Sequence, residues 1–350
     1  MRILYGVQAT GNGHTTRARA MLPELLAVGF EVDFLFSGRR RKDLFDMEPF
    51  GDYHWRRGLT FISQNGKVHK LKTVLHNNAW SFLRDVLTLD LAHYDMVVTD
   101  FEPVTAWAAK LRGKPCVGLG HQYAFQYDVP RAGGSDPIAN VILKFFAPAQ
   151  RSLGLHWSRF DDAILPPILE LRAQLPAVEE NKILVYLALD DIDTIVNWLR
   201  CVDDVAFYVY CNTKQSVDEG NIHLRPFSRQ GFQQDLLACS GVITNAGFEL
   251  LGEAMHYGKK LLVRPLNGQM EQQCNARALQ ELGYGKVVQG YDASELRTWL
   301  STQQSAPRPF PNTAKAIAHW LKTGMTQNEA LLAEWVWSGQ ADIQPAAISE

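Results

Sequence analysis

One stretch of the sequence combines glycine with polar residues directly after an apolar run, which is the chemistry of an anion-binding turn. Residues 241–244 form a short apolar run, and Asn245, Ala246 and Gly247 follow before a helix expected from about Phe248. The free N–H groups and the positive dipole end of such a helix favour a bound phosphate. The sequence therefore predicts a phosphate site at this turn.

Further polar residues follow the same turn along the chain. Glu253 falls within the first two turns of the expected helix, where its carboxylate would reach a group held at the turn. A solvated surface glutamate is the equal alternative. The next expected strand, residues 260–265, leads to a polar cluster that we expect at the same end of the sheet, where open α/β sheets bind ligands; its members are Gln269, Glu271 and Gln272.

A second glycine-rich stretch follows the first expected strand. Gly11 and Gly13 precede His14, and a helix is expected from His14 to Val28. Gly11 and Gly13 match a dinucleotide fingerprint only in part, since Thr16 stands at the third glycine position and the next strand ends without an acidic residue for a ribose. The sequence therefore argues against NAD or FAD.

Two more apolar strands deliver polar residues at their carboxyl ends. The strand at 96–99 is followed by Asp100 and Glu102, and the strand at 114–119 by His121 and Gln122. We expect these residues at the carboxyl ends of the strands, where open α/β sheets place their ligands.

The strands and helices alternate along the chain, which predicts an α/β fold with two doubly wound, Rossmann-like domains. Proline punctuation at 165–176 and at 305–311 divides the chain. A helix is also expected over residues 137–157, packed against the first domain. The predicted parts are a first domain at 1–164, a linker at 165–180, a second domain at 181–304 and C-terminal helices at 305–350.

Composition limits the class of protein. The chain has 350 residues, 46% hydrophobic and 21% charged, with a formal net charge of -2, so it reads as globular and gives no case for nucleic-acid binding. We expect a cytoplasmic protein, because no apolar run approaches about 18 residues and no signal peptide is evident. The five cysteines form no C-x-x-C pair, so neither disulfides nor a zinc site is indicated.

The motifs T-N-A-G-F, E-A-M-H-Y-G-K-K-L-L-V-R-P and G-Q-M-E-Q-Q-C-N-A together resemble the donor-sugar motif of glycosyltransferases with two facing Rossmann-like domains, the GT-B fold. The resemblance is to the enzyme that makes lipid II, to UDP-glycosyltransferases and to uncharacterised bacterial and archaeal relatives. The N-terminal G-x-G-H resembles the loop that faces donor phosphates and acceptor in that family. The resemblance implies a nucleotide-sugar donor, with UDP as the expected nucleotide, and no cofactor.

Residue roles follow from the resemblance. It implies that Asn245 to Phe248 hold the diphosphate and that Glu253 binds the ribose. Glu271 and Gln272 would bind the donor sugar, and Phe227 would stack on the base or pack in the core. On the acceptor side it implies Glu102, His121 and Gln122.

The expected chemistry is an inverting, metal-independent transfer. Retaining members often carry a glutamate where this chain has Asn245, so the inverting branch is favoured. His14 is the candidate base, because a histidine titrates near neutral pH and its loop faces the predicted cleft. Asp100 would orient the ring, and the alternative is that His14 caps its helix.

Two features leave questions open. Asp190 and Asp191 stand where the family carries glycine or serine near the diphosphate; helix capping is the favoured role, and a metal site the alternative. A basic run, Arg39 to Lys42, is usually a solvated helix start, and the alternatives are a contact with an anionic membrane surface or with a phosphorylated acceptor. Its members are Arg39, Arg40, Arg41 and Lys42.

The function expected from these observations is sugar transfer from a nucleotide sugar to an unknown acceptor, such as a lipid or cell-envelope glycan. A nucleotide-sugar 2-epimerase or hydrolase of the same fold is the alternative enzyme. A non-catalytic nucleotide-sugar binding protein is the alternative from another class.

Overall fold

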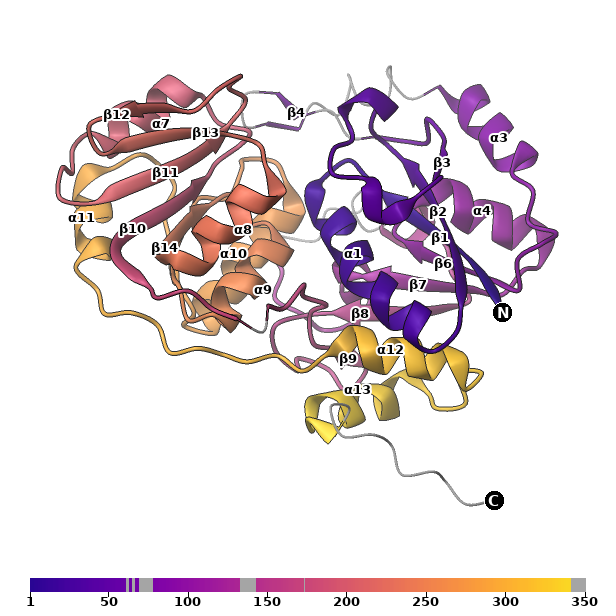
Figure 1. Cartoon of the computed structure of the whole chain (residues 1–350). Helices are drawn as coiled ribbons and strands as arrows, with labels where there is room; N and C mark the ends of the chain where they lie inside the picture. Colours follow the sequence, from indigo (N-terminus) through magenta and orange to yellow (C-terminus); the bar gives the residue numbers. More distant parts are fainter. Residues whose placement is uncertain (61–62, 65–66, 69–77, 133–142, 173, 341–350) are drawn as a thin grey trace.

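The computed structural model describes residues 1–60, 63–64, 67–68, 78–132, 143–172 and 174–340. It contains two seven-stranded sheets, one in each half of the chain, together with a small two-stranded hairpin. Figure 1 shows the two sheets as separate layered units that face each other, with helices around each. The predicted pair of doubly wound α/β domains is confirmed.

The first sheet is parallel throughout, in the order β3-β2-β1-β6-β7-β8-β9. The interior strand β1 has apolar side chains at Ile3, Leu4, Tyr5 and Val7 that are fully buried, which is typical of a parallel strand covered on both faces. The strands are β1 (Arg2–Gln8), β2 (Glu31–Ser37), β3 (His54–Trp55), β6 (Met96–Asp100), β7 (Cys116–Gly120), β8 (Arg151–Leu155) and β9 (Ile164–Leu165).

Helices cover this sheet and connect its strands. The longest follows β1 directly and ends before Gly29, whose φ of 81° is a left-handed conformation that glycine adopts without strain. The helices are α1 (Asn12–Ala27), α3 (Ala79–Thr88), α4 (Pro103–Arg112) and α5 (His121–Ala124), with short 3-10 turns η1 (Arg41–Asp43) and η2 (Glu48–Phe50). A separate antiparallel pair joins β4 (Ser63–Gln64) to β5 (Lys67–Val68).

The helix predicted over residues 137–157 is wrong at its C-terminal end. Residues 133–142 lie outside the described part, but Arg151–Leu155 form β8, which pairs with β7. Leu153 and Leu155 are both fully buried, and their spacing of two residues is the period of a strand rather than of a helix.

The second sheet has the order β12-β13-β11-β10-β14-β15-β16 and is parallel except for the edge strand β12. All six residues of β14 are buried, in keeping with the apolar run read from the sequence. The strands are β10 (Glu179–Tyr186), β11 (Ala206–Cys211), β12 (Val217–Glu219), β13 (Ile222–Pro226), β14 (Cys239–Thr244), β15 (Lys260–Val263) and β16 (Lys286–Val287).

The helices of the second half are α7 (Ile192–Leu199), α8 (Arg229–Ala238), α9 (Phe248–His256), α10 (Met270–Glu281) and α11 (Ala293–Leu300), followed by α12 (Thr313–Lys322) and α13 (Glu329–Trp337). The last two helices lie on the first domain, where α12 packs against α1 and α13 against β9 (Figure 1). The chain therefore passes between the domains twice.

The domains meet through an apolar contact at the start of α9. The ring of Phe248 stacks on His121 and Trp157 of the first domain, with centroid distances of 4.1 and 5.1 Å. Trp157 also donates its indole N–H to the carbonyl of Phe248 at 3.2 Å. This contact holds the carboxyl ends of the two sheets face to face.

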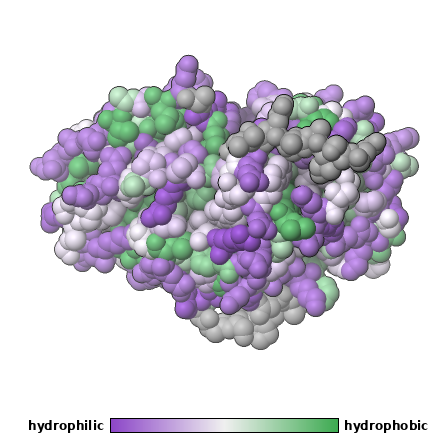
Figure 2. All heavy atoms as spheres, turned by 90° about the horizontal axis from the view of Figure 1, so that it is seen from below, coloured by the Kyte–Doolittle hydropathy of each residue, from purple (hydrophilic) through white to green (hydrophobic). Residues whose placement is uncertain are grey.

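Seen from below the view of Figure 1, the surface is mainly hydrophilic with scattered hydrophobic patches (Figure 2). Within the described residues, no helix is long and apolar enough to cross a bilayer.

Candidate functional site

His14 and Asp100 are bonded to each other in the structure. Asp100 ends β6, which pairs with β1 so that Val7 and Asp100 lie side by side, and His14 is in the first turn of the helix that follows β1. The distance from His14 Nδ1 to Asp100 Oδ1 is 2.6 Å. The alternative that His14 caps α1 is wrong, because the cap residue is Gly11 and no side chain bonds to the helix start.

Arg17, one helical turn after His14, completes a charged cluster with the same carboxylate. Its Nε donates to Asp100 Oδ2 at 2.7 Å and its Nη2 to Asp100 Oδ1 at 2.5 Å. The Nη2 atom also lies 2.9 Å from His14 Nδ1. Of the two contacts of His14 Nδ1, the one with Asp100 is the shorter. A carboxylate only accepts hydrogen bonds, whereas a guanidinium only donates them, so we assign the ring proton to Nδ1, which donates it to Asp100.

Asp100 stays ionised in this setting. Burial alone would raise the pKa of this fully buried carboxyl, but the charges and hydrogen bonds of Arg17 and His14 outweigh burial and lower its pKa. Burial opposes the charge of Arg17 in the same way, yet Asp100 and Glu249 raise the pKa of this guanidinium. The cluster therefore holds Asp100 as a carboxylate against Arg17, and the assigned tautomer places the lone pair of the His14 ring on Nε2.

The predicted acceptor-side residues have different surroundings. Glu102 is completely buried as the N-cap of α4 and accepts bonds from Val104 N, Thr105 N and the hydroxyls of Thr105 and Ser37. Its carboxylate has no room for another partner, so the structure gives Glu102 a capping role in place of the predicted acceptor contact. Burial raises the pKa of its carboxyl.

His121 and Gln122 lie at the domain contact. His121 is buried with Nδ1 2.9 Å from the carbonyl of Leu155, and burial lowers the pKa of its imidazole. Among the described residues, no partner of Nε2 meets the geometry of a hydrogen bond. Gln122 reaches the second domain, where its Nε2 donates to Glu271 Oε2 at 3.1 Å. A predicted acceptor-side residue and a predicted donor-side residue are thus in direct contact.

The turn after β14 is a constrained backbone loop. Ala246 has a φ of 67°, which is uncommon for a residue with a side chain. Asn275 of α10 holds this turn by donating from Nδ2 to the carbonyl of Ala246 at 2.9 Å. Gly247 and Gly11 face open space, since a Cβ at either position would meet no heavy atom within 4 Å. A ligand can therefore approach both backbones closely.

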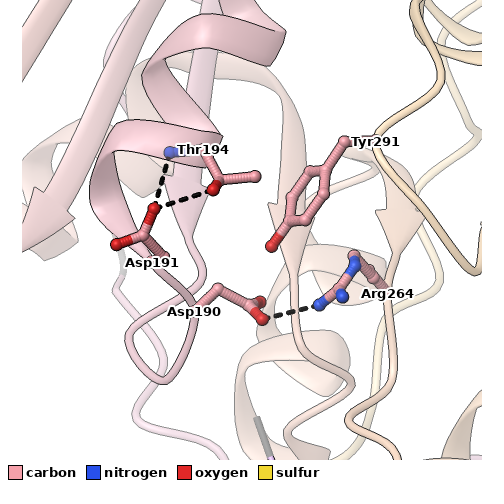
Figure 3. Close-up of a pocket in the computed structure, with 5 residues that line it drawn as sticks. All are labelled: Asp190, Asp191, Thr194, Arg264 and Tyr291. Atoms are coloured by element: carbon pink, nitrogen blue, oxygen red, sulfur yellow. Dashed lines mark hydrogen bonds and ion pairs between the residues drawn. The ribbon is translucent and has the colours of Figure 1, made fainter. Parts of the chain in front are cut away.

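Asp190 and Asp191 have separate roles, seen in Figure 3. Asp191 caps α7 and accepts bonds from Thr194 N and Oγ1 at 2.9 and 2.7 Å, so the capping prediction is confirmed for this residue. Asp190 instead accepts from Asn245 Nδ2 at 2.8 Å and pairs with Arg264 at 2.6 Å.

A cavity of about 390 Å³ is lined by Asp190, Asp191, Thr194, Arg264 and Tyr291. Arg264 lies over the ring of Tyr291. Arg264 compensates the charge of Asp190, which is why this carboxylate is tolerated beside the turn.

Glu253 points inward from α9 and is 4% exposed, so the alternative of a solvated surface glutamate is wrong. Among the residues that the structure describes, its carboxyl group accepts one hydrogen bond, from Gln233 of α8 at 3.4 Å, and its Oε1 has no partner. Burial and, next, the charge of Glu170 raise the pKa of Glu253 to about 8. A partnerless buried oxygen suits a ligand hydroxyl, but no contact in the structure tests the ribose role.

The remaining predicted donor residues are spread around the same edge. Phe227 is 40% exposed at the end of β13, so its ring is not part of the core. Gln269 precedes α10, and its Oε1 has no partner. Gln272 is buried, and its Oε1 accepts from Leu266 N at 2.9 Å, so it holds the loop that leads to Glu271.

The basic run divides into one inward and three outward residues. Arg39 donates to Asn12 Oδ1 at 2.9 Å and to the carbonyl of Thr10 at 3.0 Å, which steadies the first glycine loop. Burial lowers the pKa of Arg39. Arg40 is exposed and pairs with Asp43.

The sequence analysis did not single out Arg17, Glu249 or Asn275, and it named Arg39 only as part of the basic run, without its contact with the glycine loop. Arg17 was detectable only as a cation three residues after His14, on the same face of the helix. Asn275 stands in the quoted motif Q-C-N-A, on the inner face of its helix. In the described residues, no three His, Cys, Asp or Glu side chains gather in a way that could hold a metal ion.

Comparison with known proteins places this geometry in a family. The sequence model of the family described as glycosyl transferase family 1 matches residues 1–303. An uncharacterised glycosyltransferase of Methanosarcina mazei is 24% identical over 334 residues, which covers 82% of this chain and 86% of that protein.

Solved structures share the fold at low sequence identity. The glycosyltransferase SnogD from Streptomyces nogalater matches with a TM-score of 0.55 and 16% identity, covering 97% of this chain and 99% of that one. UGT89C1 of Arabidopsis thaliana, solved in complex with UDP, matches with a TM-score of 0.56 and 14% identity, covering 99% and 96%. The fold predicted from the motifs is thereby confirmed.

Proposed function

The chain belongs to glycosyl transferase family 1 and is a glycosyltransferase, and from that premise we propose that it moves a sugar from a nucleoside diphosphate sugar to an acceptor hydroxyl with inversion and without a catalytic metal. The observation that carries this proposal is the bond between His14 Nδ1 and Asp100 at 2.6 Å. It fixes the ring and its tautomer, as a general base requires.

The proposed reaction is a single displacement. The imidazole Nε2 of His14 takes the proton of the acceptor hydroxyl, whose oxygen then forms a bond to the anomeric carbon of the sugar. The bond from that carbon to the diphosphate oxygen breaks, and the nucleoside diphosphate leaves with the electron pair. The imidazolium that forms is stabilised by the ionised Asp100.

The donor would lie along the carboxyl edge of the second sheet. The amides at the start of α9 and its positive dipole end stabilise negative charge on the leaving diphosphate. Glu253, with its partnerless Oε1, would bind ribose hydroxyls, and the exposed ring of Phe227 would stack on the base. Glu271 and Gln269 would contact the sugar. UDP is the nucleotide we propose, since UDP and dTDP occupy the structures of fold neighbours.

The test is a paired screen of nucleoside diphosphate sugars. Ligands of the native state raise the unfolding temperature, so a thermal-shift panel identifies the donor first. Consumption of that donor is then followed with and without a panel of hydroxyl acceptors. Consumption that depends on acceptor supports the proposal; release or epimerisation of sugar without acceptor would indicate the hydrolase or epimerase instead, and tight binding without turnover a sensor.

A lipid-linked acceptor would bring the protein to the inner face of a membrane, and we propose that Arg40, Arg41 and Lys42 would make that contact. Arg39 is not counted, because it bonds to the glycine loop. Cosedimentation with vesicles that contain about 30% anionic lipid checks this. Equal binding of the parent and of a variant with all three residues changed to Gln would contradict it.

A further inference from the structure

A buried charge pair joins the two domains at the place where the proposed donor diphosphate would lie. Arg17 Nη1 on α1 donates to Glu249 Oε1 in the first turn of α9. The Arg17 side chain is 1% exposed and that of Glu249 is 16% exposed. A carboxylate of the protein itself therefore stands at the helix start that follows the Asn245 turn.

The same carboxylate fills the space over the first glycine loop. A Cβ on Gly13 would overlap Glu249 Oε2, so this oxygen lies directly against the Gly13 backbone. Beside Gly11 and Gly247, by contrast, an added Cβ would meet nothing within 4 Å. Glycines of both domains therefore border this space. Glu249 fills the part beside Gly13, and the parts beside Gly11 and Gly247 are open.

Arg17 divides its hydrogen bonds between two carboxylates. Its Nε and Nη2 bind the two oxygens of Asp100, and its Nη1 is the group that binds Glu249. A guanidinium also matches phosphate oxygens. Replacing Glu249 by a phosphate would therefore leave both bonds to Asp100 intact.

The carboxylate and a bound diphosphate cannot share this position. Like charges a few ångströms apart repel strongly in a partly buried site, and one Nη1 cannot bind both anions with the same geometry. Glu249 is partly exposed, so its side chain has a way out to solvent, whereas Arg17 and Asp100 do not.

We propose that Glu249 holds the place of a donor phosphate in the unliganded protein, and that Arg17 binds that phosphate once Glu249 has turned away. This rests on the proposed nucleoside diphosphate donor. Arg17 is then a positioning residue that connects the donor to the carboxylate of the His14 base. Before the donor binds, the ion pair of Arg17 with Glu249 connects the two domains at this place. After the donor binds, the contact of Arg17 with the diphosphate takes over this role.

The test measures anion affinity by titration calorimetry. Inorganic diphosphate and the five common nucleoside diphosphates are titrated into the parent, into Glu249→Gln and into the control Glu281→Gln, which removes an arginine-paired carboxylate elsewhere in the same domain. Removal of a competing charge should tighten inorganic diphosphate binding to Glu249→Gln by at least about tenfold. The control should stay within about twofold of the parent.

A second variant tests Arg17. Added to Glu249→Gln, the change Arg17→Lys should abolish the gain, because a lysine cannot keep the fork on Asp100 and reach a phosphate as well. If this double variant does not fold, the Glu249→Gln titration decides alone. Equal or weaker inorganic diphosphate binding by Glu249→Gln would overturn the proposal.

The two proposals fail separately. A gain for inorganic diphosphate with no binding of any nucleoside diphosphate, and no sugar consumption, supports the place-holder and sinks the proposed donor. Nucleoside diphosphate binding and acceptor-dependent turnover in the parent, without a gain in Glu249→Gln, leaves the transferase and overturns the place-holder.

Discussion

Asp100 and Glu253 are both buried carboxyl groups at the carboxyl edge of a sheet, one in each domain, yet their pKa values move in opposite directions. Asp100 binds Arg17 and His14, and its pKa is lowered. Glu253 has one long bond from Gln233, and burial raises its pKa to about 8. The partners of a buried carboxyl, more than its burial, decide whether it is charged.

The difference separates the two halves of the site. The first-domain cluster of His14, Arg17 and Asp100 is complete without a ligand, since each charge has a partner inside the protein. The second-domain group around Glu253 has polar atoms without partners, among them Glu253 Oε1 and Gln233 Oε1. Under the proposed function, the first half would be organised for proton transfer in advance, and the second would receive its missing bonds from the donor.

The largest effect is expected on the first-domain side. Loss of a positioned base typically costs about 10² to 10⁴ in rate, so His14→Ala should lower turnover by that order. Donor affinity should change by less than about threefold, because His14 is proposed to touch the acceptor. Initial rates and calorimetric donor affinity on the same folded protein check both. Turnover within a few-fold of the parent would place the base elsewhere.

Glu253→Ala should act on binding. If the carboxyl group bonds to ribose hydroxyls, its removal should weaken the nucleotide by about ten- to a hundredfold. The control is Glu295→Ala, a partly exposed glutamate of the same domain. Unchanged nucleotide affinity in a folded Glu253→Ala protein would remove Glu253 from the site.

The raised pKa of Glu253 predicts a pH dependence of stability. This carboxyl loses its proton near pH 4.5 in the unfolded chain and near pH 8 in the folded protein. Between these values the folded protein holds the additional proton, so rising pH favours unfolding, by up to about 1.4 kcal/mol for each pH unit.

The variant Glu253→Gln should lose this component. Urea unfolding of parent and variant between pH 5 and 8 should show a steeper fall for the parent, since all other groups are shared. Parallel curves would mean that Glu253 is charged and compensated in the folded protein.

The smallest effect is expected for Asp191, which tests whether a carboxylate beside the proposed diphosphate site belongs to that site. As a helix cap, Asp191→Ala should cost about 1 kcal/mol of stability and leave nucleotide affinity unchanged. Asp191→Ser, which keeps a capping oxygen without the charge, should recover most of the loss. Weaker nucleotide binding in both variants would show that Asp191 contacts the ligand.

The sequence predicted the fold through apolar runs that end in polar residues, because a parallel sheet buries its strands and collects ligand groups at one edge. The same logic named His14 and Asp100, although their contact depends on strand order and could only be proposed. It failed for Glu102, since a carboxylate at the end of a strand and a helix cap two residues further on look alike in sequence.

Arg17 shows why the sequence predicted only part of the charged cluster. An arginine in the second turn of a helix reads as a solvated cation, and its burial follows from a partner 83 residues away in the chain. Glu249 likewise reads as a favourable acidic residue at a helix start. Its ion pair requires that two domains close on each other, which no local pattern encodes.

Because the chain passes between the domains a second time, both the relative rotation of the domains and the effect of cleaving the chain between them are restricted. Residues 166–178 carry the chain from β9 to β10, and residues 301–312 carry it back from α11 to α12. Two covalent connections therefore join the first domain to the second. If one segment connected the domains, each domain could rotate in any direction relative to the other. Two connecting segments restrict this rotation to an axis that passes through both segments. Proteolytic cleavage of either connecting segment alone should leave the domains joined by the other segment. The range of relative domain orientations should then widen, while the last two helices stay packed on the first domain.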